Sequence, residues 1–364
     1  MTGGSVSGPE RLAWLRLART EGVGPVSFRE LLRRYGSAAA VLARLPDLAR
    51  RAGRSSPLRI CPIAEAEAEI AAGEAMGAAL LLACEPAYPE SLRTLDPAPP
   101  LIWALGDFGL LNRRSVALVG ARVASASGCR FARGLAGELG RHGLVIASGL
   151  ARGVDAAAHE GALATGTVAV LGGGIGDIYP PENEALYHRI AAEGCIISES
   201  APGRRAQAKD FPRRNRLISG LSLAVVVVEA ELKSGSLITA RLAAEQGREV
   251  LAVPGSPLDP RARGCNDLIR QGAAVCEGAD DVLRAIETLR GFRSPPPPDY
   301  VMDAADTPSE LLQRVFDLLS PTPVHVDELA RQAGATPGAV FAALVELSLA
   351  ERVELLPGSM AVRA

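Results

Sequence analysis

Several residue types that support common kinds of protein chemistry are scarce in this sequence. Four histidines and six cysteines occur among 364 residues, and aromatic residues make up 4%. The cysteines are far apart and form no C-x-x-C pair, which argues against a zinc site or a disulfide framework. No apolar run approaches the roughly 20 residues that span a bilayer, and Met1–Pro9 lacks the features of a secretory signal. We expect a cytoplasmic protein without metal, cofactor or membrane contact.

Lysine is also scarce, because Lys209 and Lys233 are its only two occurrences. The net charge of −2 favours neither nucleic acid nor another partner. Between Arg204 and Arg216, however, six basic residues stand against one acid, Asp210. Arginine presents a planar fork of donors that matches a phosphate group. The cluster therefore predicts a local phosphate-binding patch, and a solvated helix face is the alternative.

Short apolar runs alternate with helical patterns between residues 115 and 277. Runs that are apolar throughout are typical of strands buried on both faces of a parallel sheet. We predict an α/β domain over residues 83–290 with an extended, Rossmann-like, doubly wound and mostly parallel sheet. Helices are expected near residues 128–142, 155–165, 183–193, 214–221 and 236–246. The strands are expected at Val116–Val119, Leu144–Ala147, Val168–Leu171, Cys195–Ser198, Ala224–Val228 and Val250–Val253.

Helical patterns flank this core on both sides. Residues 1–82 predict a small helical domain, in which the turn Gly22–Pro25 joins two helices. A hairpin of this kind binds a DNA backbone or serves simply as a packing turn. Residues 291–309 contain Pro295–Pro298 and are expected to form a linker. Residues 310–364 predict three helices followed by a β-hairpin, which is the order of a winged helix.

The most suggestive loops fall at the carboxyl ends of the expected strands. In an open parallel sheet this edge binds ligands, because loops and helix N-termini present N–H groups there. Cations and helix N-termini can hold successive phosphates, and an aromatic ring can stack on a base. A surface of this type fits single-stranded nucleic acid better than a duplex, whose grooves require a helix or ribbon. The predicted binding residues are Arg122, Ser125, Gly149, Arg152, Tyr179, Lys209, Phe211, Arg213, Arg214, Asn215, Arg216, Lys233, Ser234, Gly235, Ser236 and Thr239.

Other interpretations of these loops are weaker. Neither Gly120-Ala121-Arg122 nor the triglycine at Gly172 satisfies the dinucleotide fingerprint, and a P-loop lysine is absent. Ser148, Asp155 and His159 superficially offer a nucleophile, an acid and a base, but an aspartate at a helix start is more simply a cap. Ordinary structural roles stay open for Arg152, Asp177, Phe211 and Asn215.

Together these motifs resemble the bacterial DNA-processing protein DprA (Smf) family. The similarity covers about Tyr88 to Ala273, and its motifs occur in one colinear series. They are Tyr88-Pro89, Val119–Arg122, Ser148–Asp155 with Ala158-His159, Gly172–Pro180, Phe211–Arg216, Ser234–Ala240, Pro254-Gly255, and Gly264 with Asn266, Leu268 and Ile269.

The resemblance implies a non-enzymatic protein that binds single-stranded DNA without strong sequence preference and loads the RecA recombinase onto it during natural transformation. It also implies a homodimer formed through the Rossmann-like domain, a sterile-alpha-motif-like N-terminal domain and a C-terminal winged helix. Duplex DNA is left open as a further partner. The family's phosphate-binding arginine corresponds to Arg122. Several relatives have a lysine where this chain has Pro181, and Lys209 and Arg205 are the candidates to replace it.

The C-terminal domain differs from a DNA-binding winged helix in its charge. Its expected recognition helix, Pro337–Leu347, has Glu346 as its one charged residue, and residues 310–364 contain four basic and seven acidic residues. Because phosphate affinity comes largely from neutralising charge, we predict that this helix contacts protein or packs internally.

Two rival functions belong to other classes. One is a nucleotide-processing phosphoribohydrolase of the lysine-decarboxylase-like type, which has a similar Rossmann-like core. Its signature P-G-G-x-G-T-x-x-E is missing, and Lys233–Ser236 stands near the expected place. The other is an interaction scaffold that binds no nucleic acid.

Overall fold

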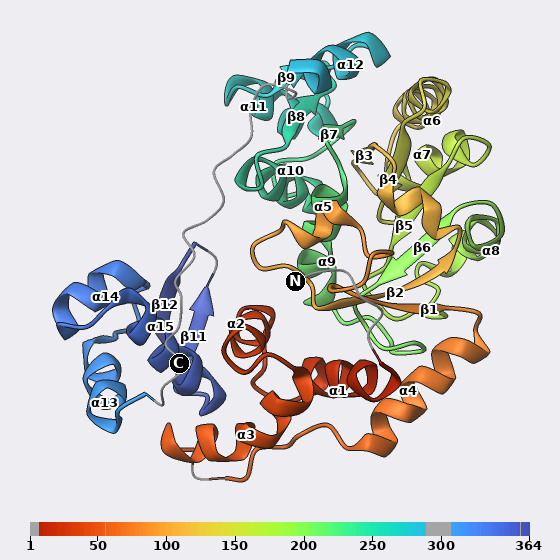
Figure 1. Cartoon of the computed structure of the whole chain (residues 1–364). Helices are drawn as coiled ribbons and strands as arrows, with labels where there is room; N and C mark the ends of the chain where they lie inside the picture. The colour runs from red at the N-terminus through yellow and green to blue at the C-terminus, as the bar shows by residue number, and fades with distance from the viewer. Residues whose placement is uncertain (1–6, 55, 289–306, 357) are drawn as a thin grey trace.

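A computed structural model describes residues 7–54, 56–288, 307–356 and 358–364. Within these residues a nine-stranded sheet forms the centre of the molecule, in the order β1-β2-β6-β5-β4-β3-β7-β8-β9 (Figure 1). Its strands are β1 (Ala79–Leu82), β2 (Leu101–Gly106), β3 (Ser115–Val119), β4 (Val145–Ser148), β5 (Thr167–Val170), β6 (Cys195–Ser198), β7 (Ala224–Val227), β8 (Glu249–Ala252) and β9 (Ala274–Val275).

The predicted doubly wound sheet is confirmed. All neighbouring strands from β6 through β3 to β9 pair in parallel, and the six predicted strands are all present. β2 joins β6 by antiparallel pairing, and β1 pairs with β2 in the same manner. β3 lies between β4 and β7, so the order of the chain reverses there. Such a switch point is where open α/β sheets bind ligands.

Helices cover both faces of the sheet. On one face, α6 (Ala126–Arg141), α7 (Val154–Ala162) and α12 (Ala279–Thr288) pack on strand residues such as Leu118 and Ile146. On the other, α9 (Asp210–Leu221), α10 (Gly235–Glu245) and α11 (Arg263–Arg270) enclose a second core. Shorter or peripheral elements are α5 (Glu90–Arg93), α8 (Glu184–Glu193), η1 (Phe108–Asn112), η2 (Pro181–Asn183) and η3 (Pro260–Ala262).

Four helices form the N-terminal part: α1 (Gly8–Arg19), α2 (Pro25–Tyr35), α3 (Ala38–Arg51) and α4 (Ile63–Ala75). Gly22 adopts a φ of 74° in the turn before α2, a conformation that favours glycine. α1 contacts the central domain, since the Trp14 indole donates to the Pro100 carbonyl at 2.9 Å. β1 pairs with β2 inside the large sheet, so the boundary expected after residue 82 falls between two paired strands.

The C-terminal part is a winged helix, as predicted. It contains α13 (Ser309–Leu318), α14 (Val326–Ala333) and α15 (Pro337–Leu349), with β10 (Val324–His325), β11 (Val353–Leu356) and β12 (Met360–Arg363) in a small sheet. Most of the expected linker, residues 291–306, lies outside the described residues. Every residue of α15 from Val340 to Leu347 is buried, which confirms that this helix packs internally.

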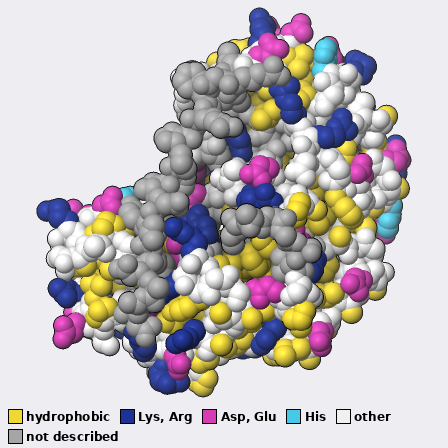
Figure 2. Space-filling model, viewed as in Figure 1, with side chains coloured by type: hydrophobic (Ala, Val, Ile, Leu, Met, Phe, Trp, Pro, Cys, Tyr) yellow, Lys and Arg dark blue, Asp and Glu magenta, His cyan; other side chains and the backbone are white. Residues whose placement is uncertain are grey.

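The described helices include none that is long and apolar enough to cross a membrane. All six cysteines are free thiols, and four of them are buried. Basic and acidic side chains are interspersed over the face shown in Figure 2, so positive charge does not spread over a broad area of it. Any anion-binding surface there has to be local.

Candidate nucleic-acid interface

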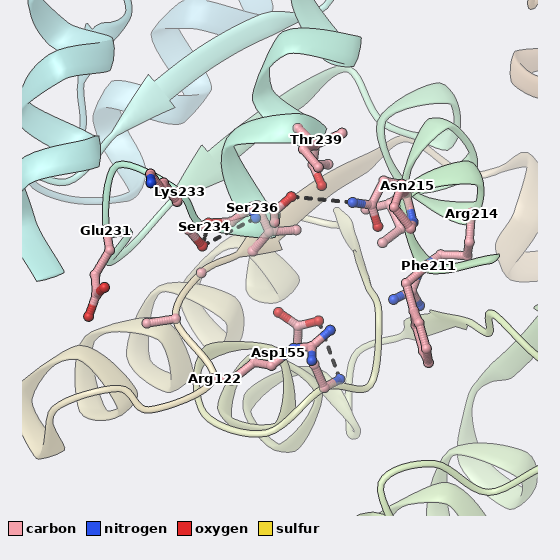
Figure 3. A pocket seen from close by; sticks show the side chains of 18 of the residues that line it. Arg122, Asp155, Phe211, Arg214, Asn215, Glu231, Lys233, Ser234, Ser236 and Thr239 are labelled. Carbon is pink, nitrogen blue, oxygen red and sulfur yellow. Dashed lines mark hydrogen bonds between the residues drawn. The ribbon is translucent and has the colours of Figure 1, made fainter. Parts of the chain in front are cut away.

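A groove of about 690 Å³ opens at the carboxyl edge of the sheet (Figure 3). Three segments form its walls: the loop after β3, the first turns of α9, and the turn between β7 and α10. This is the switch point between β3 and β7. Most of the predicted binding residues line the groove, namely Arg122, Tyr179, Phe211, Arg214, Asn215, Lys233, Ser234, Gly235, Ser236 and Thr239.

Two exposed cations stand on opposite sides of this groove. Arg122 follows β3 and Lys233 follows β7, and neither forms an ion pair with a carboxylate of the described residues. Between them lies the N-terminus of α10, where the Ser234 hydroxyl accepts a hydrogen bond from the Ser236 amide at 3.3 Å. A β-carbon added to Gly235 would have no neighbour within 4 Å, so this turn is open. A helix N-terminus and cations that lack a carboxylate partner among the described residues together favour an anion.

An aromatic pair forms the next part of the wall. The rings of Tyr179 and Phe211 lie with their centroids 5.5 Å apart and their planes tilted by 46°. Half of the surface of Tyr179 is exposed, and the Arg122 guanidinium lies 5.8 Å from the Phe211 ring centre. The rings therefore offer stacking surface directly beside a cation, which is the combination that holds single-stranded nucleic acid.

Arg214 lies beneath the groove and supports its floor. It is 7% exposed, and its Nη1 donates to the carbonyls of Gly149 and Val170. A β-carbon on Gly149 would lie 2.6 Å from the Arg214 guanidinium, so glycine permits this approach. Burial lowers the pKa of Arg214 to about 10, and the nearby Asp155 carboxylate opposes that shift. Arg214 remains cationic at neutral pH, with its donors largely directed at backbone carbonyls.

Asp155 stabilises the adjacent loop between β4 and α7. Its Oδ2 accepts from the amides of Gly149 at 3.1 Å and Ala151 at 3.3 Å. Burial raises the pKa of Asp155, whereas Arg214 and these amides lower it. Asn215 has a comparable linking role, because its Nδ2 donates to the Gly235 carbonyl at 3.3 Å and joins α9 to α10.

The remaining predicted residues lie around the groove or apart from it. A small adjoining hollow is lined by Gly149 and Arg152, and Arg152 pairs with Glu182 instead of Asp155. Arg213 is exposed and lines a further hollow beyond the aromatic pair. Lys209 is exposed at the N-terminus of α9 and does not line the groove. Arg216 pairs with Glu199 and also donates to the Pro97 carbonyl.

Ser125 lies at the N-terminus of α6, and this end is occupied by the protein's own carboxylate. The Glu229 side chain accepts from the Ser125 amide at 2.8 Å and from its hydroxyl at 2.5 Å. In a Rossmann dinucleotide site, the corresponding helix N-terminus receives the pyrophosphate. Glu229 takes that position here, so this end of α6 does not offer a phosphate site. The N-terminus of α10, in contrast, is capped by the Ser234 hydroxyl and not by a carboxylate of the described residues.

Several residues that line the groove were not among the predicted binding residues, including Val123, Glu231 and Ile238. Val123 is 84% exposed and Ile238 is 36% exposed, so both add apolar surface to the rim. Neither carries a recognisable chemical motif. Their closeness to Arg122 and Ser236 in the chain was the available signal.

Each of the three residues considered for hydrolysis has structural hydrogen-bond partners. The Ser148 hydroxyl donates to the Leu118 carbonyl at 2.6 Å, and His159 Nδ1 lies 2.7 Å from the Thr167 hydroxyl. Burial, reinforced by the charge of Arg214, lowers the pKa of His159 to about 3. The imidazole is therefore neutral and fully buried. The prediction that Asp155 caps its helix is wrong, because its carboxylate accepts from the loop amides of Gly149 and Ala151 and α7 has no side-chain cap.

Comparison with known proteins assigns all three parts of the chain. Residues 79–287 match the family described as DNA recombination-mediator protein A. Residues 9–72 match a DprA-like N-terminal HHH domain, and residues 295–359 match the DprA winged helix domain.

Individual relatives agree with this assignment. Protein Smf of Escherichia coli K12 is 37% identical over 283 residues, which cover 74% of each chain. DNA processing protein DprA of Streptococcus pneumoniae is 42% identical over 206 residues, covering 55% of this chain and 71% of that protein.

Solved structures extend the similarity to the fold. The X-ray structure of S. pneumoniae DprA aligns with a TM-score of 0.65 and 33% identity, covering 77% of this chain and 98% of that chain. A structure that describes the single-stranded DNA binding mode of Helicobacter pylori DNA processing protein A aligns with a TM-score of 0.52 and 31% identity, covering 59% and 96%. The chain belongs to the DNA recombination-mediator protein A (DprA/Smf) family.

Proposed function

We propose that this chain binds single-stranded DNA in the groove at the β3–β7 switch point, without strong sequence preference. The observation that carries the proposal is the position of exposed Arg122 and Lys233, which have no carboxylate partner among the described residues, beside the Tyr179–Phe211 ring pair. Phosphates would contact the two cations and the N-terminus of α10, while a base stacks on the rings. Neither contact depends on base identity, because every base has a face and every nucleotide has a phosphate.

The proposed role is that of a non-enzymatic cytoplasmic mediator. It would hold the strand, load the RecA recombinase onto it and so support natural transformation, acting as a homodimer through the Rossmann-like domain. A catalytic role has little support, because Ser148 and His159 are buried and bonded to structural partners. The phosphoribohydrolase alternative would require release of free base from nucleoside monophosphates.

Equilibrium titration of the full chain with fluorescent oligonucleotides tests DNA binding. Single strands of mixed and homopolymeric sequence should bind with similar affinity, and duplexes of equal length should bind more weakly. The logarithm of the binding constant should fall linearly with that of the salt concentration, because phosphate contacts release counterions. Equal affinity for single strands and duplexes, or no salt dependence, would contradict the proposed mode.

RecA loading requires a separate measurement. Single strands precoated with single-strand-binding protein should support RecA filament formation faster when the chain is present. A chain that binds single strands but leaves the filament rate unchanged would refute the mediator role and retain the binding role. Sedimentation of the full chain would test the proposed homodimer.

A further inference from the structure

The winged-helix domain packs through α15 against α2 and α3 of the N-terminal domain (Figure 1). A single apolar cluster continues from α1–α3 into α13–α15, so the two domains share one core. At its centre, Arg34 of α2 pairs with Glu346 of α15 at 3.0 Å, and both side chains are 0% exposed. The Thr307 hydroxyl also donates to Glu346, at 2.7 Å.

A second charged contact lies at the C-terminal end of α15. Arg54, with 7% of its side chain exposed, donates to the Leu349 carbonyl at 3.0 Å and pairs with Glu351 at 3.1 Å. The Leu349 carbonyl belongs to the last turn of the helix, where the macrodipole concentrates partial negative charge. Arg54 therefore meets two negative groups from the same end of α15.

The glycine turn of the N-terminal domain faces the same end of α15. A β-carbon on Gly22 would lie 3.6 Å from the Leu349 carbonyl oxygen. Ser27, in the first turn of α2, has its hydroxyl 3.0 Å from the hydroxyl of Ser348. Arginine donors, a glycine turn and a helix start are the groups with which proteins contact DNA phosphates. Each of them contacts a carboxylate, a carbonyl or a hydroxyl of the winged helix, and Arg54 also pairs with Glu21 of the N-terminal domain at 3.4 Å.

The winged helix and the N-terminal face that it covers differ in their capacity to bind DNA. The recognition-helix position of the winged helix is filled by α15, which is apolar around its circumference and buried. It has no positive charge to offer a duplex. The N-terminal face, in contrast, has the arginines and the turn but is covered. Charge complementarity thus assigns the DNA-binding capacity to the N-terminal face.

We propose that the winged-helix domain substitutes for a nucleic-acid backbone on this face, with Glu346, Glu351 and the end of α15 in place of phosphates. Release of the domain would expose Arg34, Arg54 and the Gly22 turn as a second surface that binds duplex DNA. The winged helix would stay attached through the expected linker. This site is distinct from the groove and does not depend on the function proposed for it.

The test uses the full chain with Arg122→Ala and Lys233→Ala, which disable the groove. A failure of the proposed duplex-binding surface can then be distinguished from a failure of the proposed single-strand binding in the groove. In this background, Glu346→Arg places a second cation beside Arg34. Breaking a buried ion pair shifts an equilibrium by about 100-fold or more. Duplex binding should tighten by at least about tenfold, with a steeper salt dependence. The matched control is Glu328→Arg, because Glu328 pairs with Arg331 within α14.

A reversible disulfide across the interdomain contact tests whether opening of this contact causes the gain in duplex binding. The Ser27→Cys and Ser348→Cys pair places two thiols close enough for a disulfide after a small adjustment. Oxidation should hold the domains together and abolish the duplex binding gained by Glu346→Arg, and reduction should restore it. The parent chain with its native cysteines is oxidised in parallel as the control.

Each outcome decides the proposal. The rate of cross-linking in the cysteine pair reports how far the two domains separate. If Glu346→Arg slows cross-linking but duplex binding does not increase, the proposed DNA-binding face is refuted. A folded Glu346→Arg chain that cross-links at the original rate would refute the role of the ion pair in closure. Should Glu346→Arg lose its helical circular dichroism, Glu351→Arg replaces it, because Glu351 is 57% exposed and tolerates substitution more readily.

Discussion

The groove and the interdomain contact both gather positively charged side chains, yet they use them in opposite ways. Around the groove, Arg122 and Lys233 extend into solvent without a carboxylate partner among the described residues. At the interdomain contact, Arg34 is fully buried against Glu346 and Arg54 is almost buried beside Glu351. A solvated cation is available to a ligand, whereas a buried pair is committed to structure until both partners are released. Residue type alone does not separate the two roles.

The largest expected effect is on stability, from removing the buried cation. Arg34→Ala should lower the free energy of unfolding by about 3–5 kcal/mol, because it leaves the Glu346 carboxylate buried without its cation. Urea denaturation measures the change. Arg50→Ala is the control, because Arg50 is 76% exposed and should be replaceable with little effect. Similar midpoints for both variants would remove the distinction between the two regions.

Removing the two solvated cations should affect binding and leave stability unchanged. The double substitution Arg122→Ala and Lys233→Ala should weaken single-strand binding by about 100-fold at about 0.1 M salt and reduce the salt slope by about 1.4. The matched control is Arg130→Ala with Arg141→Ala, which removes the same charge from exposed positions of α6. Equal losses in both pairs would mean that net charge, and not the groove, attracts DNA.

The stacking contribution should be separable from charge. Phe211→Leu keeps an apolar side chain against Gly172 but removes the ring, and should weaken single-strand binding by about 1–3 kcal/mol. The salt slope should stay as in the parent chain, because no phosphate contact is lost. Fluorescence titration at several salt concentrations measures both quantities. A changed slope with unchanged affinity would contradict stacking at this ring.

A last effect depends on pH and concerns the buried layer beneath the groove. The pKa of His159 is about 3 in the folded chain, below the ordinary value of 6.5, because burial disfavours its charged form. The unfolded chain therefore binds a proton first as the pH falls, so this residue's contribution to stability is present above pH 6.5 and is lost below it. The loss is about 1.4 kcal/mol per pH unit between pH 6.5 and about 3.

The variant His159→Gln should remove that part of the pH dependence. Urea denaturation at pH 7, 6 and 5 compares its slope with that of the parent chain. Parallel slopes would show that His159 does not titrate as its burial requires. Single-strand binding at pH 7 should be nearly unchanged, which separates this layer from the exposed rim.

The strands of the core could be predicted because burial on both faces demands continuous apolar runs. Cys195–Ser198 coincides with β6, and the other five predicted strands differ from the observed ones by one residue at their ends. Strand β2, which lies between β1 and β6, was not predicted. Its pairing partner β6 lies about ninety positions later in the sequence, and such non-local pairing leaves no local signature.

The groove was predictable for a similar reason. Parallel strands bring their carboxyl ends to one edge, so Arg122 and Lys233, which follow different strands, had to lie near each other. The sequence did not separate residues that line the groove from residues that support it. Arg214 turned inward to backbone carbonyls, Arg216 met Glu199 and Ser125 met Glu229. Each partner comes from another segment of the chain.

Apolar periodicity, glycine turns and the position of charges after strands thus defined the layers of this protein and the edge that carries its groove, because these are local properties of the chain. Whether each charged side chain is exposed or buried in an ion pair was decided by segments distant in the sequence. α15 is apolar on all sides and had to be buried somewhere, but only the folded chain placed it on α2 and α3 and set Glu346 against Arg34. Long-range packing decides whether an arginine side chain stays exposed to solvent or becomes buried. An exposed arginine is available to bind DNA, whereas a buried one is not.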